Sequence, residues 1–552
     1  MSNSLQYQPV SRNIKTLIGK PRFQALELES LDLDVLARDI FPSLNIQLLQ
    51  KIVSHNGKTE LLVAEMSLER FENLKRAYDG RLIVEEDRPL DLFKPTGIDL
   101  PIVPNFKANL IPLKDDELTI PLMIRDSQTQ QPIANAHVTL IGSLWYADGI
   151  TDAAGRITLT LYGETADTLS GLMVRPAANY WSFWLDQPVL RPGQDNVVAL
   201  KAFDQTLADF PQTESLGWGQ KAMGLGDAQI PYRGNGIKIG IIDSGGYIDH
   251  QDLGDHANGK DFTAEATPTS WKLDPMAHGT HVAGVIVGLM DEFGIRGFAP
   301  EADYHVCKIF PGGTFSALIN SLNECMTAGV DIVNLSLGSS TYSELLEQKI
   351  QEVTDAGVAC IAAAGNSATK LQYPAAYDDV LAVSAIGQVD TFPSSSAHIR
   401  QVGAHKSADG KFFTAKFTCF ADVNQRLDVC APGVAVVSAV SAEADAYAAW
   451  DGTSMACPHV VGLAALILEA RSDIRAMSRE RGRVNALFQA IRESAVDLGL
   501  PYPYQGHGLP QVLKALKIPP EAPDADTPDS PWTQIEELLQ QILKLLRSQV
   551  ET

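Results

Sequence analysis

The sequence predicts an α/β protein in which a parallel-sheet domain is preceded by a small α+β domain and an antiparallel β-sandwich. Three observations support this prediction: a short α+β pattern near the N-terminus, period-two alternation from about residue 115 to residue 203, and near-continuous apolar strands separated by helical stretches from residue 237 onward. Apolar strands joined by helices are typical of a parallel sheet that is buried on both faces. The 552 residues have room for about three to five folded units.

The composition narrows the classes of function. Apolar residues make up 45% and charged residues 20% of the chain, so we expect ordinary globular domains. The net charge of −23 has the wrong sign for a phosphate backbone, and nucleic acid is not expected as a partner. We find no apolar run of about 18 residues and no apolar core of a secretory signal, so no membrane contact is expected. The six cysteines include no Cys-x-x-Cys pair, which favours reduced thiols and a cytoplasmic location.

Residues 1–94 are predicted to form the small α+β domain. A strand pattern at residues 60–64 is followed by a helical stretch at 68–77 and a second strand pattern at 82–85. Prolines then occur at positions 95, 101, 104 and 112. Because proline-rich segments are typical of connections with few tertiary contacts, we expect a linker before residue 113.

Residues 113–205 are predicted to form the β-sandwich. Apolar residues alternate along the first strand, at Leu118, Ile120, Leu122 and Ile124, and alternation recurs at 137–141 and 157–161. Short strands with one buried and one wetted face, separated by turns, are typical of antiparallel sheets. No group of residues in this region has a catalytic pattern.

Residues 215–518 are predicted to form the α/β domain. Its apolar strands are expected at 237–242, 302–309, 331–337, 358–364 and 380–386. An acidic, proline-rich linker follows at 519–531, and residues 532–552 are predicted to form an amphipathic helix with one apolar stripe. A lone helix of this length needs a surface to cover, which could belong to its own chain, to a second copy or to a partner protein.

Three segments of the α/β domain carry an arrangement suited to nucleophilic catalysis. Asp243 ends a predicted strand in an Asp-Ser-Gly segment, His278 opens a helix in His-Gly-Thr-His, and Ser454 opens another in Gly-Thr-Ser-Met. A serine hydroxyl needs a nearby base, and that base needs a carboxylate to hold its tautomer. From the residues alone, Asp249 or Asp252 could supply the carboxylate instead.

A zinc site is the alternative interpretation of the histidines. His278 and His281 lie three residues apart on a predicted helix, where two imidazoles can share a face. However, the sequence offers no third ligand at a suitable spacing and no His-Glu-x-x-His motif. We therefore do not expect zinc.

Over residues 237–507, these segments resemble the motifs of the subtilisin-like (S8) serine peptidases. The resemblance implies a serine endopeptidase that needs no cofactor for its chemistry and acts on peptides or proteins. The segment Ala-Ala-Gly-Asn at 363–366 resembles the family's oxyanion-hole segment, which assigns Asn366 as one donor and the backbone N–H of Ser454 as the other. Ser336, Leu337 and Gly338 resemble the segment that pairs with the substrate backbone.

The same resemblance implies a structural calcium site. Many relatives bind Ca²⁺ at positions that match Asp252 and Asp291, together with the carbonyl oxygens of Leu289, Phe293 and Ile295. The alternative is that both carboxylates are solvated loop charges.

Two further resemblances concern the regions before the α/β domain. Residues 78–87 resemble the end of the inhibitor-like (I9-type) prodomains, and the predicted sandwich resembles transthyretin-like modules. We therefore expect a peptidase that its N-terminal domain regulates, and the alternative is a catalytically silent scaffold that binds peptides or partner proteins. Residues 388–429 exceed what the minimal family core needs, and the sequence assigns them no role.

Overall fold

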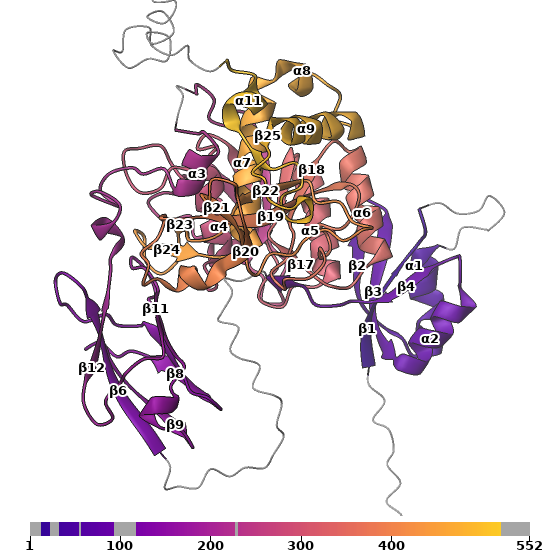
Figure 1. The fold of residues 1–552 in the computed structure, drawn as a ribbon. Coiled ribbons are helices and arrows are strands. Elements are labelled where there is room, and N and C mark those ends of the chain that lie inside the picture. Colours follow the sequence, from indigo (N-terminus) through magenta and orange to yellow (C-terminus); the bar gives the residue numbers. More distant parts are fainter. Residues whose placement is uncertain (1–12, 23–31, 55–56, 93–116, 227–229, 520–552) are drawn as a thin grey trace, which may run out of the picture.

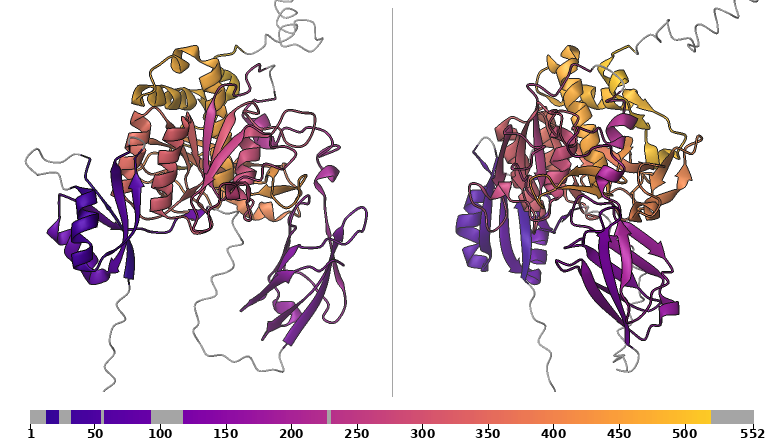
Figure 2. Two further views of the ribbon diagram at one scale, coloured as in Figure 1. Left: turned by 180° about the vertical axis from the view of Figure 1, so that it is seen from behind. Right: turned by 90° about the vertical axis from the view of Figure 1, so that its left-hand side faces the viewer.

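The computed structural model describes residues 13–22, 32–54, 57–92, 117–226 and 230–519. Three regions are visible: an N-terminal sheet, a β-sandwich and a central α/β region (Figure 1). The N-terminal sheet and the sandwich lie on opposite sides of the α/β region, and Figure 2 shows the same arrangement from behind and from the side. The predicted helix at 532–552 and the predicted linker beyond Pro519 lie outside the described residues.

The N-terminal region is a four-stranded antiparallel sheet in the order β2-β3-β1-β4. Its strands are β1 (Asn13–Gly19), β2 (Gln47–Val53), β3 (Thr59–Ser67) and β4 (Ile83–Glu86). Its helical segments are α1 (Leu33–Val35), η1 (Leu36–Ile40), η2 (Pro42–Leu44) and α2 (Leu68–Ala77). Neighbouring residues of β1 face opposite sides, so Ile18 packs with the helices of this region while Leu17 packs against the α/β region. The two-residue strand β5 (Asp91–Leu92) ends the described part.

The sandwich consists of two facing sheets, in the orders β11-β10-β7-β8 and β12-β6-β9. Its strands are β6 (Glu117–Asp126), β7 (His137–Ile141), β8 (Tyr146–Ile150), β9 (Arg156–Tyr162), β10 (Gly171–Arg175), β11 (Phe183–Asp186) and β12 (Asn196–Leu200), with short helical turns at η3 (Ala166–Thr168) and η4 (Phe203–Gln205). Along β6 every second residue is buried between the sheets, as its alternating sequence predicts.

One strand pair of the sandwich differs from the prediction. β12 runs parallel to β6, with Asn196 beside Leu122 and Leu200 beside Asp126, whereas the other pairs in the two sheets are antiparallel. Parallel neighbours need a long crossover connection, and here the five strands β7 to β11 lie between the two in the chain. The prediction of an entirely antiparallel sandwich is wrong for this pair.

The α/β region is built on a nine-stranded sheet in the order β14-β15-β13-β16-β18-β19-β21-β20, with β22 also paired to β19. Its strands are β13 (Lys238–Asp243), β14 (Ala257–Asp261), β15 (Asp303–Lys308), β16 (Ile332–Leu335), β18 (Ala359–Ala363), β19 (Val380–Gln388), β20 (Val402–Lys406), β21 (Phe412–Ala415) and β22 (Val429–Pro432). The pairs are parallel except at β21, which runs antiparallel to β19 and β20. The prediction of an α/β fold with a parallel sheet is confirmed.

Helices cover both faces of this sheet. The longer ones are α4 (His278–Val287), α5 (Phe315–Ala328), α6 (Glu344–Asp355), α7 (Thr453–Ala470) and α9 (Arg481–Ser494). Successive residues of β13 separate the two cores: Ile241 packs with α4 and α7, and Ile242 packs with α5 and α6. The short elements are α3 (Trp218–Ala222), η5 (Ser270–Lys272), β17 (Leu337–Gly338), η6 (Ala397–Gln401), β23 (Val436–Ala439), β24 (Tyr447–Trp450), α8 (Ser472–Arg475), β25 (Ala495–Val496), α10 (Tyr502–Gln505), β26 (Leu509–Pro510) and α11 (Val512–Leu516).

Helix α7 is unusually apolar. Within the described residues it is the one helix with the length and hydropathy of a membrane-crossing segment, and 89% of that stretch is buried inside the protein. Because α7 packs against the sheet and against α4, its apolar composition is that of a central core helix.

Candidate active site

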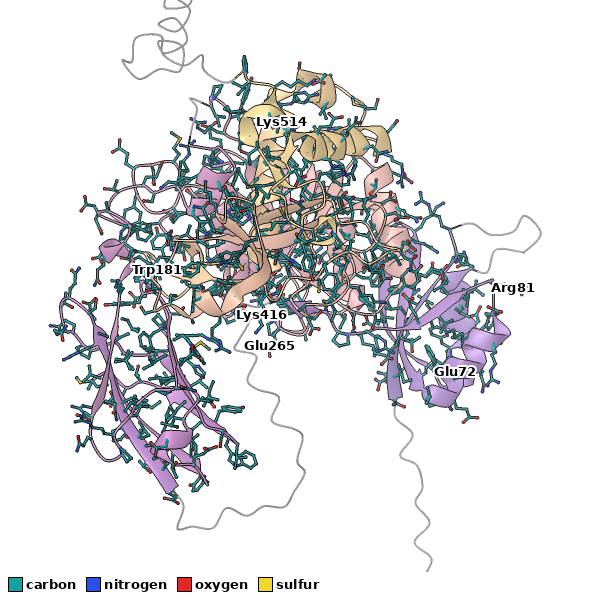
Figure 3. The ribbon with its side chains drawn as sticks, viewed as in Figure 1. Glu72, Arg81, Trp181, Glu265, Lys416 and Lys514 are labelled. Atoms are coloured by element: carbon teal, nitrogen blue, oxygen red, sulfur yellow. The ribbon has the colours of Figure 1, made fainter. Side chains whose placement is uncertain are left out.

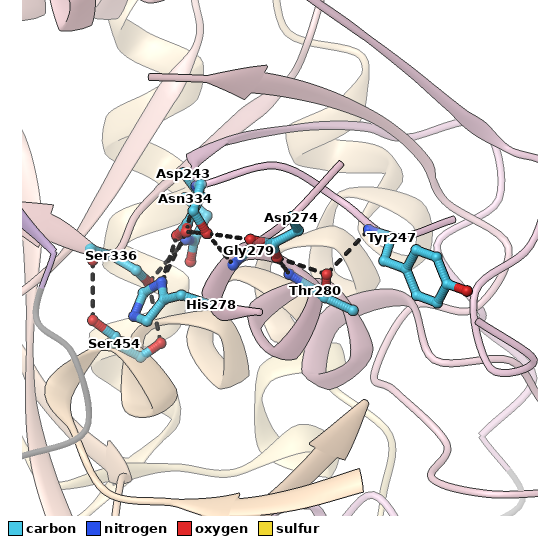
Figure 4. A network of polar contacts seen from close by, with 10 residues as sticks. Asp243, Tyr247, Asp274, His278, Gly279, Thr280, Asn334, Ser336 and Ser454 are labelled. Atoms are coloured by element: carbon cyan, nitrogen blue, oxygen red, sulfur yellow. Dashed lines mark hydrogen bonds and ion pairs between the residues drawn. The ribbon is translucent and has the colours of Figure 1, made fainter. Parts of the chain in front are cut away.

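The predicted catalytic residues meet at one edge of the sheet. Asp243 is the last residue of β13, and α4 and α7 begin beside it with His278 and Ser454 near their N-termini. Ligands of open α/β sheets bind at the carboxyl ends of the parallel strands, which is where these side chains lie. Figure 4 shows the imidazole of His278 lying between the carboxylate of Asp243 and Ser454.

The carboxylate and the imidazole are in direct contact. The Nδ1 atom of His278 lies 2.8 Å from Oδ1 and 3.0 Å from Oδ2 of Asp243. The backbone N–H and the hydroxyl of Ser244 also donate to Asp243, at 2.7 and 3.1 Å. These donors stabilise a charged carboxylate, so Asp243 can hold a proton on Nδ1 and leave Nε2 as the basic nitrogen of the ring. The carboxylate against Nδ1 of His278 is thus that of Asp243, whereas Asp252 accepts a hydrogen bond from the backbone N–H of Ile295.

Ser454 is held by the segment that follows β16. Its hydroxyl donates to the carbonyl oxygen of Ser336 at 3.0 Å, and the hydroxyl of Ser336 donates to the carbonyl oxygen of Ser454 at 3.1 Å. Asn334 in turn donates to the Ser336 hydroxyl at 2.9 Å. Asp243, His278 and Ser454 are each at most 1% exposed, so solvent does not reach the group in this arrangement.

Asn366 has its side-chain oxygen fixed by the start of α7. The Oδ1 atom accepts hydrogen bonds from the backbone N–H of Thr453 at 2.9 Å and from its hydroxyl at 2.8 Å. Because the oxygen is used in this way, the amide presents its N–H₂ group as the donor. Gly365, just before it, has a φ of +113°, and a Cβ there would come within 2.9 Å of the Cys419 sulfur. The turn that aims Asn366 therefore requires glycine.

Asp274 supports the start of α4, and the sequence analysis did not identify it. Its carboxylate accepts hydrogen bonds from the backbone N–H and hydroxyl of Thr280, at 2.8 and 2.7 Å, and from the hydroxyl of Ser244 at 2.7 Å. Burial and the nearby charge of Asp243 raise the pKa of Asp274. The N-cap position of α4 is Ala277, three residues after Asp274, so the sequence has no ordinary capping signal for this carboxylate. Asp274 ties the carboxylate side of the site to the helix that carries the imidazole.

His281 has a structural role. Its ring stacks on Trp450 with centroids 4.7 Å apart, and its Nε2 lies 3.0 Å from the carbonyl oxygen of Val436. Burial lowers the pKa of His281 to about 3, which keeps the ring neutral. His278 faces Asp243 instead, and the described residues contain no group of three or more His, Cys, Asp or Glu side chains that could hold a metal ion. The geometry gives the zinc interpretation no support.

The predicted substrate-binding segment is already paired with another strand. Leu337 and Gly338 form β17, which runs antiparallel to β5 of the N-terminal region, with Leu92 opposite Leu337 and Asp91 opposite Gly338. Just before this pair, the backbone N–H of Leu90 donates to the carbonyl oxygen of Gly313 at 2.8 Å. A segment of this chain therefore occupies the edge at which the sequence analysis expects a substrate.

The predicted calcium ligands lie around one buried carboxylate. The Oδ2 atom of Asp252 accepts a hydrogen bond from the backbone N–H of Ile295 at 2.7 Å, and Leu289 donates to the carbonyl oxygen of Asp252 at 2.9 Å. Asp291 is exposed, and its Oδ1 is 3.4 Å from the N–H of Phe293. Burial raises the pKa of Asp252 to about 7. The Oδ1 atom of Asp252 is buried beside the hydroxyl of Tyr447, and a buried carboxylate oxygen fits a cation ligand.

Comparisons with known proteins find similarity over the α/β region. The model of the subtilase family matches residues 234–508. Subtilisin DY of Bacillus licheniformis is 33% identical over 294 residues, which cover 52% of this chain and 93% of that protein. A subtilisin of Bacillus pumilus is 31% identical over 295 residues with the same coverage, and subtilisin BL of Lederbergia lenta is 35% identical over 238 residues, 42% of this chain and 77% of that protein.

Proposed function

Because the chain belongs to the subtilase family and is a subtilisin-like serine endopeptidase, we propose that Asp243, His278 and Ser454 perform its peptide-bond hydrolysis. The observation that carries this proposal is the 2.8 Å contact between the Asp243 carboxylate and Nδ1 of His278, beside Ser454 at the start of α7. An aligned carboxylate, imidazole and hydroxyl form the arrangement that activates a serine for acyl transfer.

In the proposed reaction Ser454 is the nucleophile. Its Oγ attacks the carbonyl carbon of the scissile bond while Nε2 of His278 takes the hydroxyl proton, and Asp243 stabilises the imidazolium that forms. His278 then gives the proton to the departing amine, which leaves an acyl group on Ser454. Water, deprotonated by His278, hydrolyses this ester and restores the hydroxyl.

Asn366 is proposed to stabilise the negative oxygen of the tetrahedral intermediate. Its Oδ1 is fixed by Thr453, which leaves the amide N–H₂ as a preoriented donor, and the backbone N–H of Ser454 at the helix N-terminus is the second donor.

The chemistry is tested by two variants. Ser454→Ala should abolish both peptide cleavage and labelling by a fluorophosphonate, because the nucleophile is gone. Asn366→Ala should lower kcat by about 100- to 1,000-fold with the fold retained. If Asn366→Ala cleaves peptides as fast as the parent chain, Asn366 is not an oxyanion donor.

We propose in addition that the N-terminal region holds the enzyme inactive. β5 covers β17, and acidic side chains of the N-terminal region cap two helices: Asp87 accepts from the N–H and hydroxyl of Ser316 at 2.9 and 2.7 Å, and Glu85 accepts from Ser343 and from the N–H of Glu344 at 3.2 Å. Groups at the starts of both helices thus donate to side chains of the N-terminal region, and these hydrogen bonds fasten the region in place. A substrate can pair with β17 only after β5 leaves.

Leu92→Asp tests this proposal. Leu92 is 9% exposed in the apolar cluster under β5, and a carboxylate there loses its hydration without gaining a partner. The full-length variant should therefore cleave casein and react with a fluorophosphonate about 10- to 100-fold faster than the parent chain. Leu68→Asp is the matched control, because Leu68 is 53% exposed in the same region. If the parent chain reacts with the fluorophosphonate as fast as Leu92→Asp does, the N-terminal region does not inhibit the enzyme. If neither chain cleaves casein or is labelled, the scaffold alternative is favoured.

The location and the ion are proposals as well. All six cysteines are buried and unpaired, which supports a reducing compartment such as the cytoplasm. Asp252 and Asp291, with the carbonyl oxygens of Leu289, Phe293 and Ile295, would hold a structural Ca²⁺ that has no part in the chemical steps.

A further inference from the structure

A cavity of about 500 Å³ lies between the sandwich and the α/β region, next to the proposed oxyanion donor. The α/β region lines it with Asn366, Phe417 and Trp450, among others, and the sandwich lines it with Met173 and Arg175. Its volume is in the range of ordinary ligand sites. The face of Trp450 stacks on His281 and lies 6.4 Å from the ring of His278, so the cavity adjoins the imidazole of the active site.

The sandwich wall of this cavity is firmly attached. The loop between β10 and β11 contains Asn179, whose backbone N–H donates to the carbonyl oxygen of Tyr447 at 2.7 Å. The backbone N–H of Tyr447 donates in turn to the side-chain Oδ1 of Asn179 at 2.8 Å. Trp181 from the same loop is 3% exposed and belongs to the main core of the α/β region. Figure 3 shows Trp181 where the sandwich meets the α/β region, and Lys416 at the edge of that region.

Residues 388–429 supply the opposing part of the wall. The backbone N–H of Trp184 donates to the carbonyl oxygen of Ser395 at 2.9 Å, and the hydroxyls of Ser182 and Ser396 lie 3.1 Å apart. The same stretch lines the cavity with Arg400 and Lys416, among others. The segment to which the sequence assigned no role therefore joins the sandwich to the edge of the active site.

The position of the cavity indicates which part of a substrate reaches it. The chain of β5 runs along β17 toward Ser336, which is hydrogen-bonded to Ser454. A peptide bound in the same direction places the residues before the scissile bond along β17, and the residues after that bond continue past Ser454. β17 pairs with β5 of the N-terminal region, whereas residues of the sandwich line the cavity. The leaving-group side of the substrate thus extends toward the cavity.

The cavity carries more positive than negative charge. Arg175 is partly buried, and within the described part of the chain it forms no salt bridge; its Nε is 3.5 Å from the sulfur of Met173. Burial lowers the pKa of Arg175, because a charged guanidinium that has lost part of its hydration is less stable. Arg400 lies over the ring of Trp184 at 3.9 Å, and its Nη1 is also 3.9 Å from Oδ1 of the exposed Asp186. Lys416 adds a third positive charge.

The one carboxylate that lines the cavity is already engaged. Asp451 is 8% exposed, and its Oδ1 accepts a hydrogen bond from the backbone N–H of Ala435 at 2.7 Å and lies 2.7 Å from Nδ1 of His398. It therefore offsets the cations only in part. A carboxylate entering from the substrate would meet guanidinium groups in apolar surroundings, where such contacts are strong.

We propose that this cavity binds the leaving-group side of the substrate and that Arg175 and Arg400 select a carboxylate there. The carboxylate belongs either to an aspartate or glutamate within the first three residues after the scissile bond, or to a C-terminus located there. This inference rests on the proposed function, because it describes the specificity of the same active site.

The test measures kcat/KM for matched quenched fluorescent peptides with the full-length Leu92→Asp chain. One set carries glutamate or glutamine at each of the first three positions after the scissile bond, with an amidated end. A second set ends at those positions with a free carboxylate or an amide. We expect a preference of about tenfold for the carboxylate in one set, the usual size for a hydrogen bond to a charged group. Its salt dependence should be marked.

Substitution of the arginines shows which side chains produce the preference for a carboxylate. Arg175→Gln and Arg400→Gln should each reduce the ratio toward one, and Arg175→Lys, which keeps the charge, should retain part of it. Arg191→Gln is the matched control, because Arg191 is an exposed arginine of the sandwich that does not line the cavity. A preference that persists in both glutamine variants overturns the assignment.

Two further outcomes distinguish failure of the proposed carboxylate preference from failure of the proposed function. Cleavage of all peptides with ratios near one, in a chain that a fluorophosphonate labels at Ser454, overturns the inference and leaves the proposed function intact. Absence of labelling in every form overturns the proposed function, and the inference falls with it.

Discussion

The N-terminal sheet and the β-sandwich both pack on the α/β region, but their interfaces are built from different interactions. The N-terminal sheet adds charged contacts to its apolar ones: Glu85 and Asp87 cap helices, and Glu60 pairs with the buried Lys349. The sandwich is held mainly by the buried ring of Trp181 and by hydrogen bonds between Asn179 and the backbone of Tyr447. The ion pair of Arg400 with the exposed Asp186 at this interface is long, at 3.9 Å.

The difference has a physical consequence for regulation. Charged contacts, such as those of the carboxylates with helix N-termini and with Lys349, weaken as salt is added and change with pH. The free energy gained by burying an aromatic ring does not depend on screening or on protonation. The N-terminal sheet thus has the interface of a region that can leave. The sandwich has the interface of a permanent part of the active-site wall.

The largest effect is expected at the sandwich interface. Trp181→Ala removes a ring that packs edge-on against Phe203 and, across the interface, against His398, with centroids 5.0 and 5.9 Å apart. The cavity it leaves should lower the free energy of unfolding by about 3–5 kcal/mol. Urea unfolding measures this loss. Trp145→Ala is the matched control, because Trp145 is 40% exposed in the same sandwich, and its effect should stay within about 0.5 kcal/mol. Equal losses of stability in the two variants would show that burial of Trp181 is not what holds the sandwich on the α/β region.

An intermediate effect is expected at Asp252, which contacts Tyr447 of β24, the strand that Asn179 of the sandwich also contacts. Burial raises the pKa of Asp252 to about 7, so its protonated form is favoured in the folded state, and its contribution to stability is present at pH 4 and is lost as the pH rises to 7. In a calcium-free buffer at pH 8, Asp252→Asn should therefore raise the free energy of unfolding by about 1 kcal/mol. Thermal unfolding from pH 5 to pH 8 measures the difference.

The same variant tests the proposed calcium site. Added Ca²⁺ should stabilise the parent chain at pH 8 and leave Asp252→Asn unchanged, because a neutral amide is a weaker ligand than a carboxylate. If calcium shifts the melting temperature of both chains equally, Asp252 does not hold the ion.

The smallest effect is expected from Glu85, at the N-terminal interface. Burial raises the pKa of Glu85, so docking is favoured below the usual glutamate pKa and is weakened as the pH rises through the raised value. Latency of the full-length chain should therefore fall severalfold between pH 4 and pH 7, and Glu85→Gln, which does not titrate, should lack this component. Fluorophosphonate labelling rates across this range provide the measurement. An identical pH profile in the two chains would show that Glu85 does not control docking.

Much of the α/β region was predictable because its signals are local. The apolar runs that become β13, β16, β18 and β19 are buried on both faces, and such runs have few other solutions. The strand β1 was not predicted, although it is central in the N-terminal sheet. Its partners β3 and β4 are distant in sequence, and strand pairing of this kind leaves little local signature.

The parallel pair of β6 and β12 escaped prediction for a similar reason. The alternating residues of β6 identify a strand with one buried face, but they do not specify the direction of its neighbour. That direction depends on how the seven strands of the sandwich return to the first, which is a property of the whole domain.

The sequence by itself determined the candidate nucleophile, base and carboxylate, because each lies in a short motif at the end of a strand or the start of a helix, where local backbone geometry aims the side chain. Only the tertiary structure decided that Arg175 of the sandwich lies in one cavity with Trp450, and that β5 lies on β17. These neighbours are hundreds of residues apart, and no local preference encodes them. The burial of apolar surface between separately folded regions brings them together.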